Sequence, residues 1–234
     1  MRLDKFLSES GLFSRSEAGR AIRGGRIRVD GTVIKDPAVH IAEAAQVFCD
    51  GQKVNWSRYQ YIMLHKPAGY VSATEDRGRT VMDLLPPACT RLGMFPCGRL
   101  DIDTTGLLLI TNDGPGAHIW LSPKRHVAKT YSYTCALPLT EDARLRMEDG
   151  MELGDFTAQP ARVRCTGDCC GEITIAEGKF HQIKRMFAAV GNEITSLKRI
   201  TFGPLELDAA LEPGQWRYLT DAEIRALQEI CKKS

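Results

Sequence analysis

The N-terminal part of the chain carries the hydrophobic pattern of two short helices followed by a hairpin. Apolar residues recur at helical spacing over residues 3–7 and predict an amphipathic helix that ends at Gly11. Residues 14–17 have the Ser-x-x-Glu form of a capping box and predict a second helix, which ends at the glycine pair 24–25. Apolar and polar residues then alternate over 26–34 around an Asp-Gly turn, as expected for a hairpin.

Beyond this module, strand patterns outnumber helical patterns. Strands are predicted at 61–64, 107–110, 129–135, 172–175 and 196–200, and helices at 140–148, 181–190 and 220–232. Many strands with few helices are typical of an α+β domain on an antiparallel or mixed sheet. Residues 51–59 predict a short linker, so we expect an N-terminal module over 1–58 and a second domain over 59–234.

Composition places the chain among ordinary globular proteins. It has 234 residues, of which 43% are hydrophobic and 26% charged, which excludes disordered and coiled-coil classes. No run approaches the roughly 18 apolar residues of a membrane span. The first residues carry Asp4 and Glu9 and lack an apolar segment, so no secretion signal is predicted. We therefore expect a cytoplasmic protein without a membrane partner.

Cysteine usage gives no indication of a metal or disulfide framework. The chain has eight cysteines but no C-x-x-C, and no histidine lies close in sequence to the cluster Cys165, Cys169 and Cys170. Scattered, reduced, mostly buried thiols are expected, and a metal site would require distant residues to converge. The chain also lacks a phosphate-binding glycine motif, so neither a metal nor a cofactor is predicted.

Positive charge is concentrated near the N-terminus. Residues 1–58 hold ten Lys and Arg against seven Asp and Glu, whereas the rest of the chain holds 21 against 22. We call the five arginines of this part the arginine patch: Arg15, Arg20, Arg23, Arg26 and Arg28. Such a patch beside a neutral body indicates a polyanionic partner. The alternative is a solvated surface that only keeps the chain soluble.

Two short helices and a hairpin with arginines on one surface resemble the S4 domain, a small RNA-binding module. The resemblance covers roughly residues 1–50 and rests on R-L-D-K-F-L, S-R-S-E-A and G-R-I-R-V-D-G. It implies that the arginine patch binds RNA, which suits arginine because its planar guanidinium grips phosphates in bidentate fashion and stacks on bases. Such contacts position an RNA but specify little of its sequence.

A polar loop over residues 98–106 carries the most informative chemistry. Its two carboxylates, Asp101 and Asp103, are bracketed by glycines and run directly into the apolar strand predicted over 107–110. Aspartate at the entry of a strand is often only a turn former. The residues by themselves leave a turn and a catalytic acid as alternatives.

The loop sequence G-R-L-D-x-D-T-T-G-L-L-L resembles the catalytic loop of the pseudouridine synthases. Three further stretches occur in the order of that family: L-H-K-P-x-G at 64–69, K-T-Y at 129–131 and E-G-K-F-H-Q-I-K-R-M at 177–186. Together with the S4-like module, the resemblance spans nearly the whole chain. It implies an enzyme that isomerises uridine in RNA to pseudouridine and needs no cofactor.

The resemblance implies that Asp101 is the catalytic carboxylate. The reaction breaks the glycosidic N1–C1′ bond, rotates the base and joins C5 to C1′. A carboxylate there acts as a nucleophile, stabilises oxocarbenium-like charge or takes a sugar proton, and the sequence does not separate these routes. Asp103 is the second choice and more simply orders the loop.

Lys184 and Tyr131 are the other catalytic residues that the resemblance implies. A carboxylate in a site that excludes water needs a nearby cation to stay ionised. Lys184 matches the family position for that cation, although more distant synthases carry an arginine there, with a bidentate fork that lysine lacks. Tyr131 would stack on the extruded uracil, or its hydroxyl would help to move the C5 proton. The alternative for Lys184 is a solvated basic helix face, and the alternative for Tyr131 is an ordinary half-buried aromatic residue of a strand.

Arg99 and Arg185 are further candidates for RNA contacts. Arg99 lies two residues before Asp101, where it fills the space left by a flipped nucleotide or braces the loop. The stripe expected to be buried on the helix over 181–190 consists of Ile183, Met186, Phe187 and Val190. Arg185 and His181 lie opposite this stripe, where a solvated face is the alternative to an RNA contact.

The form K-F-H-Q-I-K-R-M resembles that of the family members that act on small-subunit rRNA, whereas large-subunit relatives tend to carry Asn-Arg before the glutamine. Together with the absence of a basic tail, this resemblance implies a target in 16S ribosomal RNA, within the free RNA or an assembling small subunit. The resemblance implies uridine 516 in the standard rRNA numbering. One alternative is a pseudouridine synthase of the same branch of this family that acts on 23S rRNA. Another is a non-catalytic RNA-binding or ribosome-assembly factor, and a third is a hydrolase with an acidic site, which leaves the arginine patch unexplained. We expect a monomer.

Overall fold

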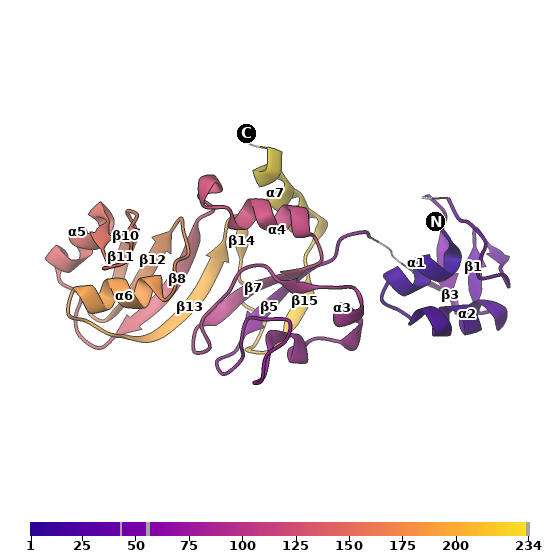
Figure 1. Ribbon diagram of the computed structural model, residues 1–234, viewed down its shortest axis with the longest axis horizontal. Helices are drawn as coiled ribbons and strands as arrows, with labels where there is room; N and C mark the ends of the chain where they lie inside the picture. Colours follow the sequence, from indigo (N-terminus) through magenta and orange to yellow (C-terminus); the bar gives the residue numbers. More distant parts are fainter. Residues whose placement is uncertain (43, 55–56, 233–234) are drawn as a thin grey trace. The chain divides into compact units, whose positions relative to one another are not determined.

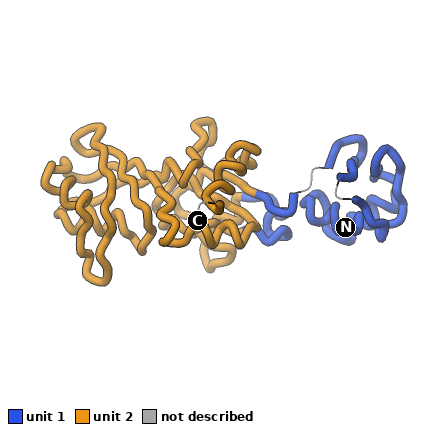
Figure 2. Tube along the Cα trace, turned by 90° about the horizontal axis from the view of Figure 1, so that it is seen from above, with its two compact units in different colours: residues 1–60, 85–94 blue, residues 61–84, 95–234 orange. Residues whose placement is uncertain are grey.

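The computed structural model describes residues 1–42, 44–54 and 57–232, and Figure 1 shows the elements that they form. Contacts divide the chain into two compact units, which Figure 2 colours separately. The first unit comprises residues 1–60 together with 85–94, and the second comprises 61–84 and 95–234.

The first unit contains the two predicted helices and a small antiparallel sheet. The helices are α1 (Leu3–Glu9) and α2 (Arg15–Arg23), and the segment 85–94 adds the short α3 (Pro87–Arg91). The sheet has the order β2-β1-β3-β4, with β1 at Ile27–Val29, β2 at Thr32–Val33, β3 at Val47–Cys49 and β4 at Gln52–Lys53.

The predicted capping box is present at the start of α2. Ser14 Oγ accepts from the Glu17 amide at 3.4 Å, and the Ser14 amide donates to Glu17 Oε2 at 2.7 Å. The apolar faces of both helices meet the sheet in one core, where Leu3, Leu7 and Ile22 are fully buried. The opposite face of α2 is thereby left to solvent.

The predicted linker over residues 51–59 is wrong at its beginning. Gln52 and Lys53 form β4, which pairs with β3 through Phe48 and Cys49. The sequence signal was the Asp50-Gly51 pair, which is typical of a tight hairpin turn. In the structure these two residues adopt the positive φ angles that such a turn requires, 50° and 82°. Of the predicted linker, Asn55 and Trp56 lie outside the described residues.

The second unit is built on one large mixed sheet, as predicted. Its order is β11-β12-β8-β13-β7-β5-β15, with β14 paired to β13 and β6 to β7. The strands are β5 (Tyr61–Lys66), β6 (Phe95–Pro96), β7 (Thr105–Thr111), β8 (Lys129–Cys135), β11 (Arg162–Gly167), β12 (Cys170–Ile175), β13 (Ile194–Phe202), β14 (Leu205–Glu206) and β15 (Trp216–Tyr218). A separate ribbon pairs β9 (Met151–Glu152) with β10 (Thr157–Ala158).

One short parallel pairing, between β7 and β13, joins the two halves of this sheet. Lys198 lies opposite Thr105, and Arg199 lies opposite Gly106. Gly106 has a φ of +101°, and a Cβ atom there would overlap the main chain of Arg199, so only glycine permits this approach. Arg199 is also opposite Tyr131 on β8, which brings the start of β7 level with Tyr131 across β13.

Helices pack on both halves of the sheet, on either side of the β7–β13 pairing (Figure 1). They are α4 (Gly114–Leu121), α5 (Glu141–Asp149), α6 (Gln182–Ala189) and α7 (Asp221–Lys232), with 3-10 turns at Val81–Leu84 and Pro123–Arg125. The Trp120 indole of α4 donates to the Leu227 carbonyl of α7 at 3.1 Å. On the other half, Phe187 of α6 packs edge-to-face on Tyr133 of β8, with ring centroids 4.9 Å apart.

All eight cysteines are free thiols, but only four of them are buried. Cys49, Cys89, Cys97 and Cys135 are buried, so the expectation of mostly buried thiols holds for half of them. Cys165 is exposed on β11, a strand at the edge of the sheet, where it lies opposite Gly171.

Every helix in the described ranges is too short or too polar to pass through a lipid bilayer.

Candidate active site

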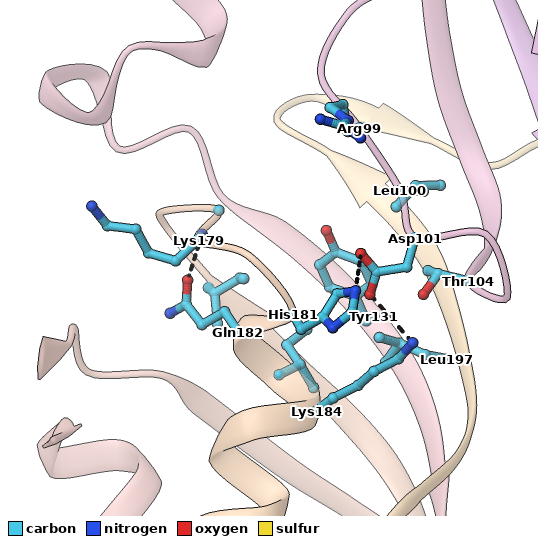
Figure 3. A pocket seen from close by; sticks show the side chains of 13 residues that line it. Arg99, Leu100, Asp101, Thr104, Tyr131, Lys179, His181, Gln182, Lys184 and Leu197 are labelled. Atoms are coloured by element: carbon cyan, nitrogen blue, oxygen red, sulfur yellow. Dashed lines mark hydrogen bonds and ion pairs between the residues drawn. The ribbon is translucent and has the colours of Figure 1, made fainter. Parts of the chain in front are cut away.

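A half-open pocket lies where the loop before β7, strand β8 and the start of α6 meet (Figure 3). The side chains that line it are Arg99, Leu100, Asp101, Thr104, Tyr131, Ile175, Lys179, His181, Gln182, Ile183, Lys184 and Leu197, with Gly178 contributing main chain. The pocket therefore combines residues from three of the four stretches that carry the family resemblance, although they are far apart in the sequence.

A buried lysine holds the loop that carries Asp101 through hydrogen bonds to its main chain. The Lys66 side chain at the end of β5 is fully buried, and its Nζ donates to four main-chain carbonyls. These are the carbonyls of Pro67 at 3.1 Å, Asp101 at 3.0 Å, Ile102 at 3.2 Å and Thr104 at 2.9 Å. The ammonium thus satisfies the tight turn by which the carboxylate loop enters β7.

Lys66 belongs to the L-H-K-P-x-G stretch, but no role was predicted for it. The available signal was a lysine that directly continues a wholly apolar strand, since a charge in that position is rarely buried without dedicated partners. The Ser72 hydroxyl also holds this loop. Ser72 Oγ donates to the Leu100 carbonyl at 2.9 Å, and the Leu100 amide donates to Ser72 Oγ at 3.1 Å.

Replacing Lys66 with methionine should lower the free energy of unfolding by about 3 kcal/mol, because buried carbonyls lose their donor. Burial lowers the pKa of Lys66 to about 8, so the unfolded chain binds this proton more tightly than the folded chain. The wild type should therefore gain stability as the pH rises from about 8 towards the ordinary lysine pKa, and its margin over the variant should widen. Denaturant titrations of both proteins across that range measure the margin. A margin that stays constant or narrows would contradict this account of Lys66.

Two basic side chains approach the Asp101 carboxylate from the start of α6 and the residue that caps it. Lys184 Nζ lies 3.3 Å from Asp101 Oδ2, and His181 Nε2 lies 3.6 Å from Asp101 Oδ1, as the dashed lines of Figure 3 show. The Asp101 side chain is about one quarter exposed, so a ligand can reach the carboxylate from the pocket. The predicted pairing of Asp101 with Lys184 is thus present as a geometry.

Lys184 also binds the second carboxylate of the loop, more closely than the first. Its Nζ donates to Asp103 Oδ1 at 2.5 Å. This hydrogen bond lowers the pKa of Asp103. Burial alone would lower the pKa of Lys184, but the bond to Asp103 and the charges of both carboxylates outweigh it and raise that pKa. Lys184 therefore stays charged at neutral pH, and Asp103 holds it beside Asp101.

Tyr131 is buried in the wall of the pocket, whereas Tyr133 on the same face of the strand contacts residues outside the pocket. Tyr131 is 7% exposed and shares the lining with Asp101 and Lys184. Tyr133 lies two residues further along β8, packs on Phe187 and places its hydroxyl 3.8 Å from Cys165 Sγ. Only Tyr131 is therefore available to a ligand of the pocket.

A tightly bonded loop leads into α6. Buried Glu177 accepts from the Gln159 amide at 2.8 Å and from Gln182 Nε2 at 2.7 Å, and the Lys179 amide donates to Gln182 Oε1 at 3.0 Å. His181 then adopts a left-handed conformation with φ 50° and ψ 29°, which ends the loop and begins the helix. No role was predicted for Glu177 and Gln182, although both lie in the matched stretch.

The stripe predicted to be buried on α6 is largely correct. Ile183, Met186 and Phe187 are buried, whereas Val190 is only partly buried because it is the residue that ends the helix.

The structure distributes the predicted RNA-binding arginines over three surroundings. Arg99 is exposed and lies at the opposite end of the pocket from Lys184 (Figure 3). Arg185 is not among the lining residues, because it binds the Asp155 carboxylate and the Leu153 carbonyl and stacks over Phe156 at 4.7 Å. The geometry therefore places Arg99, but not Arg185, beside the carboxylate loop.

In the first unit, all five members of the arginine patch are exposed, but two have partners. Arg26 forms an ion pair with Asp50 at 2.6 Å, and Arg28 donates to the Gly31 carbonyl at 3.2 Å. The other three, Arg15, Arg20 and Arg23, form no ion pair with any residue described. The charge available to a polyanion is therefore greatest on the outer face of α2.

In the described part of the chain, no group of three or more His, Cys, Asp or Glu side chains could hold a metal ion. The pocket instead offers one carboxylate flanked by a lysine and a histidine, an aromatic wall and a half-open mouth. Such a site can stabilise positive charge, accept a proton or act as a nucleophile at an electrophilic carbon.

Comparisons with known proteins show what the two parts of the chain are similar to. The model of the RNA pseudouridylate synthase family matches residues 60–189, and the model of the S4 domain matches residues 1–47. An uncharacterised RNA pseudouridine synthase of Bacillus subtilis is 42% identical and covers 98% of this chain and 99% of its own length. Ribosomal small subunit pseudouridine synthase A of Salmonella typhimurium is 42% identical and covers 97% of this chain and 100% of its own length.

Among solved structures, a crystal structure of a pseudouridylate synthase superimposes with a TM-score of 0.69 at 37% identity. The match covers 97% of this chain and 99% of that chain.

Proposed function

Because the chain belongs to the RNA pseudouridylate synthase family, we propose that it isomerises one uridine of small-subunit (16S) ribosomal RNA to pseudouridine. The observation that carries this proposal is the Asp101 carboxylate, which faces the pocket between Lys184 and Tyr131. The small-subunit assignment rests on similarity over nearly the full length to relatives named ribosomal small subunit pseudouridine synthase A. Uridine 516 is the proposed position.

In the proposed reaction, the target uridine leaves its stack and enters the pocket, at a cost of a few kcal/mol. Cleavage of the N1–C1′ bond leaves the sugar with oxocarbenium-like charge, which the Asp101 carboxylate stabilises across the pocket. Lys184 pairs with this carboxylate and orients it, with Nζ 3.3 Å from Oδ2 in the unbound site. Asp103 positions Lys184 in turn through the 2.5 Å hydrogen bond.

The detached uracil must then turn so that C5 faces C1′. Tyr131 supports the ring during this rotation, because a buried aromatic wall permits turning in plane while it prevents escape. The uracil leaves with the electron pair of the N1–C1′ bond, so after C5 bonds to C1′ a proton must leave C5 and one must reach N1. The Tyr131 hydroxyl, which lies on that wall, is proposed to relay this transfer by accepting one proton as it gives up its own. No step of this scheme needs an electron carrier or a metal.

We further propose that the N-terminal module, with a boundary near residue 58, holds the rRNA while the second domain acts. Arg15, Arg20, Arg23 and Arg99 are the proposed RNA contacts, whereas Arg26, Arg28 and Arg185 already have partners within the protein. The proposed setting is the cytoplasm, where a monomer meets free 16S rRNA or an assembling small subunit.

Mapping of pseudouridines in the rRNA of a strain that lacks the gene tests the assignment. We expect one site, at position 516 of 16S rRNA, to be lost and to return when the gene is restored. Loss of a site in 23S rRNA instead would contradict the small-subunit assignment while leaving the reaction intact. An unchanged map of both rRNAs would contradict the proposal as a whole.

Replacing Arg15, Arg20 and Arg23 together with glutamine should weaken rRNA binding and reduce its salt dependence. Each lost phosphate contact removes about 0.7 to 0.9 from the slope of log affinity against log salt, so a decrease of roughly 2 is expected. Arg26→Gln is the matched control, because its guanidinium is already paired with Asp50 and should change the slope by less than one contact. If the triple variant keeps the wild-type slope, the face of α2 is not the RNA footprint.

A further inference from the structure

Phe180 is an exposed aromatic side chain in the loop that leads into α6. It is 75% exposed, the largest exposed fraction among the large hydrophobic side chains in the described residues. A side chain this apolar normally gains by burial, so its exposure beside a functional pocket requires an explanation. Neither the fold nor the proposed reaction uses it.

The loop around Phe180 is built to hold the ring outside. Glu177 and Gln182 close the loop through the 2.7 Å hydrogen bond, and Gln182 also accepts from the Lys179 amide. The left-handed turn at His181 then directs the chain into α6. Because both sides of Phe180 are fixed in this way, the ring is presented at a constant position instead of being left on a loose end.

Phe180 also continues the line of groups that begins at the acid. Its ring stacks on the His181 imidazole, with centroids 3.8 Å apart and planes inclined by 18°. The same imidazole lies 3.6 Å from the Asp101 carboxylate and lines the pocket, as Figure 3 shows. The Asp101 carboxylate, the His181 imidazole and the Phe180 ring thus lie one after another, from the pocket to the solvent.

The charges beside this ring suit a nucleic-acid strand. Lys179 precedes Phe180 in the chain and is exposed, with its Nζ 5.9 Å from the Phe156 ring. Single-stranded RNA is bound where cations track the phosphates and aromatic rings stack on the bases. A flipped uridine necessarily exposes the faces of the bases next to it, so an aromatic ring one layer outside the pocket has a partner.

We propose that Phe180, backed by His181, is a stacking subsite for the nucleobase next to the target uridine. The subsite accepts any base, because every base has a π face, and it holds the strand open while the uridine occupies the pocket. This inference rests on the proposed function for the identity of the strand, but the stack itself requires only a single-stranded RNA that contains uridine.

The test uses the full chain and two short single-stranded RNAs with one uridine each. In one RNA the base 5′ to the uridine is the fluorescent analogue 2-aminopurine, and in the other it is the base 3′ to it. Stacking on an aromatic ring quenches this fluorophore. The variants are Phe180→Ala, Phe180→Leu and Phe180→Trp. The control is Leu145→Ala, which removes an exposed apolar side chain from α5, away from the pocket.

We expect the wild type, Phe180→Trp and Leu145→Ala to quench one of the two RNAs on binding. Phe180→Ala and Phe180→Leu should bind about tenfold more weakly, without quenching, because one base stack is lost. On rRNA, Phe180→Ala should raise KM about tenfold and leave kcat within about twofold. Equal thermal unfolding of the variants excludes a folding defect.

Three results would overturn the subsite: quenching of neither RNA by the wild type, unchanged binding by Phe180→Ala, or a kcat loss at constant KM. The last result would mean that Phe180 acts on Asp101 through His181. Failure of the proposed function is distinguishable, because a wild type that makes no pseudouridine in rRNA would still reveal the subsite by quenching that Phe180→Ala abolishes.

Discussion

Asp101→Asn should abolish pseudouridine formation, with turnover reduced by at least about a thousandfold, while RNA binding stays within about threefold of the wild type. The amide has nearly the shape of the carboxylate but carries no charge, so it neither stabilises a cationic sugar nor serves as a base or nucleophile. Release of the C5 hydrogen from labelled uridine in rRNA measures turnover, and filter binding measures affinity.

Asp103→Asn is the matched control for this experiment. It removes the same charge from the same loop, and Lys184 contacts both carboxylates. We expect a loss of about tenfold, because Lys184 loses its closer partner but Asp101 is retained. If the two variants lose turnover to the same extent, the charge of the loop matters and the position of Asp101 does not. If Asp103→Asn alone is inactive, the assignment of the acid is wrong.

Lys184→Met should reduce kcat about a hundredfold and change KM by less than about threefold. The methionine keeps most of the volume of the side chain but removes the ammonium that lies 3.3 Å from Asp101. A fixed cation beside a reacting carboxylate contributes to the transition state more than to the binding of RNA.

Lys184→Arg separates charge from shape. The guanidinium restores the positive charge and offers two donors to the carboxylates, so we expect most of the lost turnover to return. A Lys184→Met protein that turns over normally at saturation and only binds RNA weakly would show that Lys184 contacts a phosphate and does not support the acid. Single-turnover rates at saturating enzyme distinguish these results.

Most of the fold follows from short-range patterns in the sequence. The capping box at Ser14 and the glycine pair at 24–25 predict both ends of α2, since these residues supply their own hydrogen bonds and φ angles. The alternation over 129–135 predicts β8 with the bounds observed. Such elements are local, so no knowledge of their neighbours is required.

The elements that were missed depend on contacts between distant residues. Helix α4 begins Gly-Pro-Gly, which reads as a turn, and it forms because Asp113 caps it and Trp120 docks on α7. Strand β15 has three residues, too few for an alternation, and pairing with β5 defines it.

The candidate site shows the same division. Asp101, Tyr131 and Lys184 could be named because they lie in stretches that resemble a known family. The hydrogen bonds from Lys66 to the acid loop and the stacking of Phe180 on His181 could not be predicted, because spacing along the chain does not reveal which carbonyl or ring a side chain meets in the fold. Arg26 illustrates the reverse case, since its neighbours in sequence gave no sign that Asp50 neutralises it.

The Gly106 contact has a consequence for how this enzyme could vary. Asp101 precedes one half-sheet, whereas Tyr131 and Lys184 belong to the other, and the described strands of the two halves meet in two residue pairs beside Gly106. The distance between the acid and its partners therefore depends on a seam that tolerates no side chain. Even a single methyl group at the seam would meet the main chain of Arg199 and shift Asp101 relative to Tyr131 and Lys184, so we expect only glycine to serve at position 106.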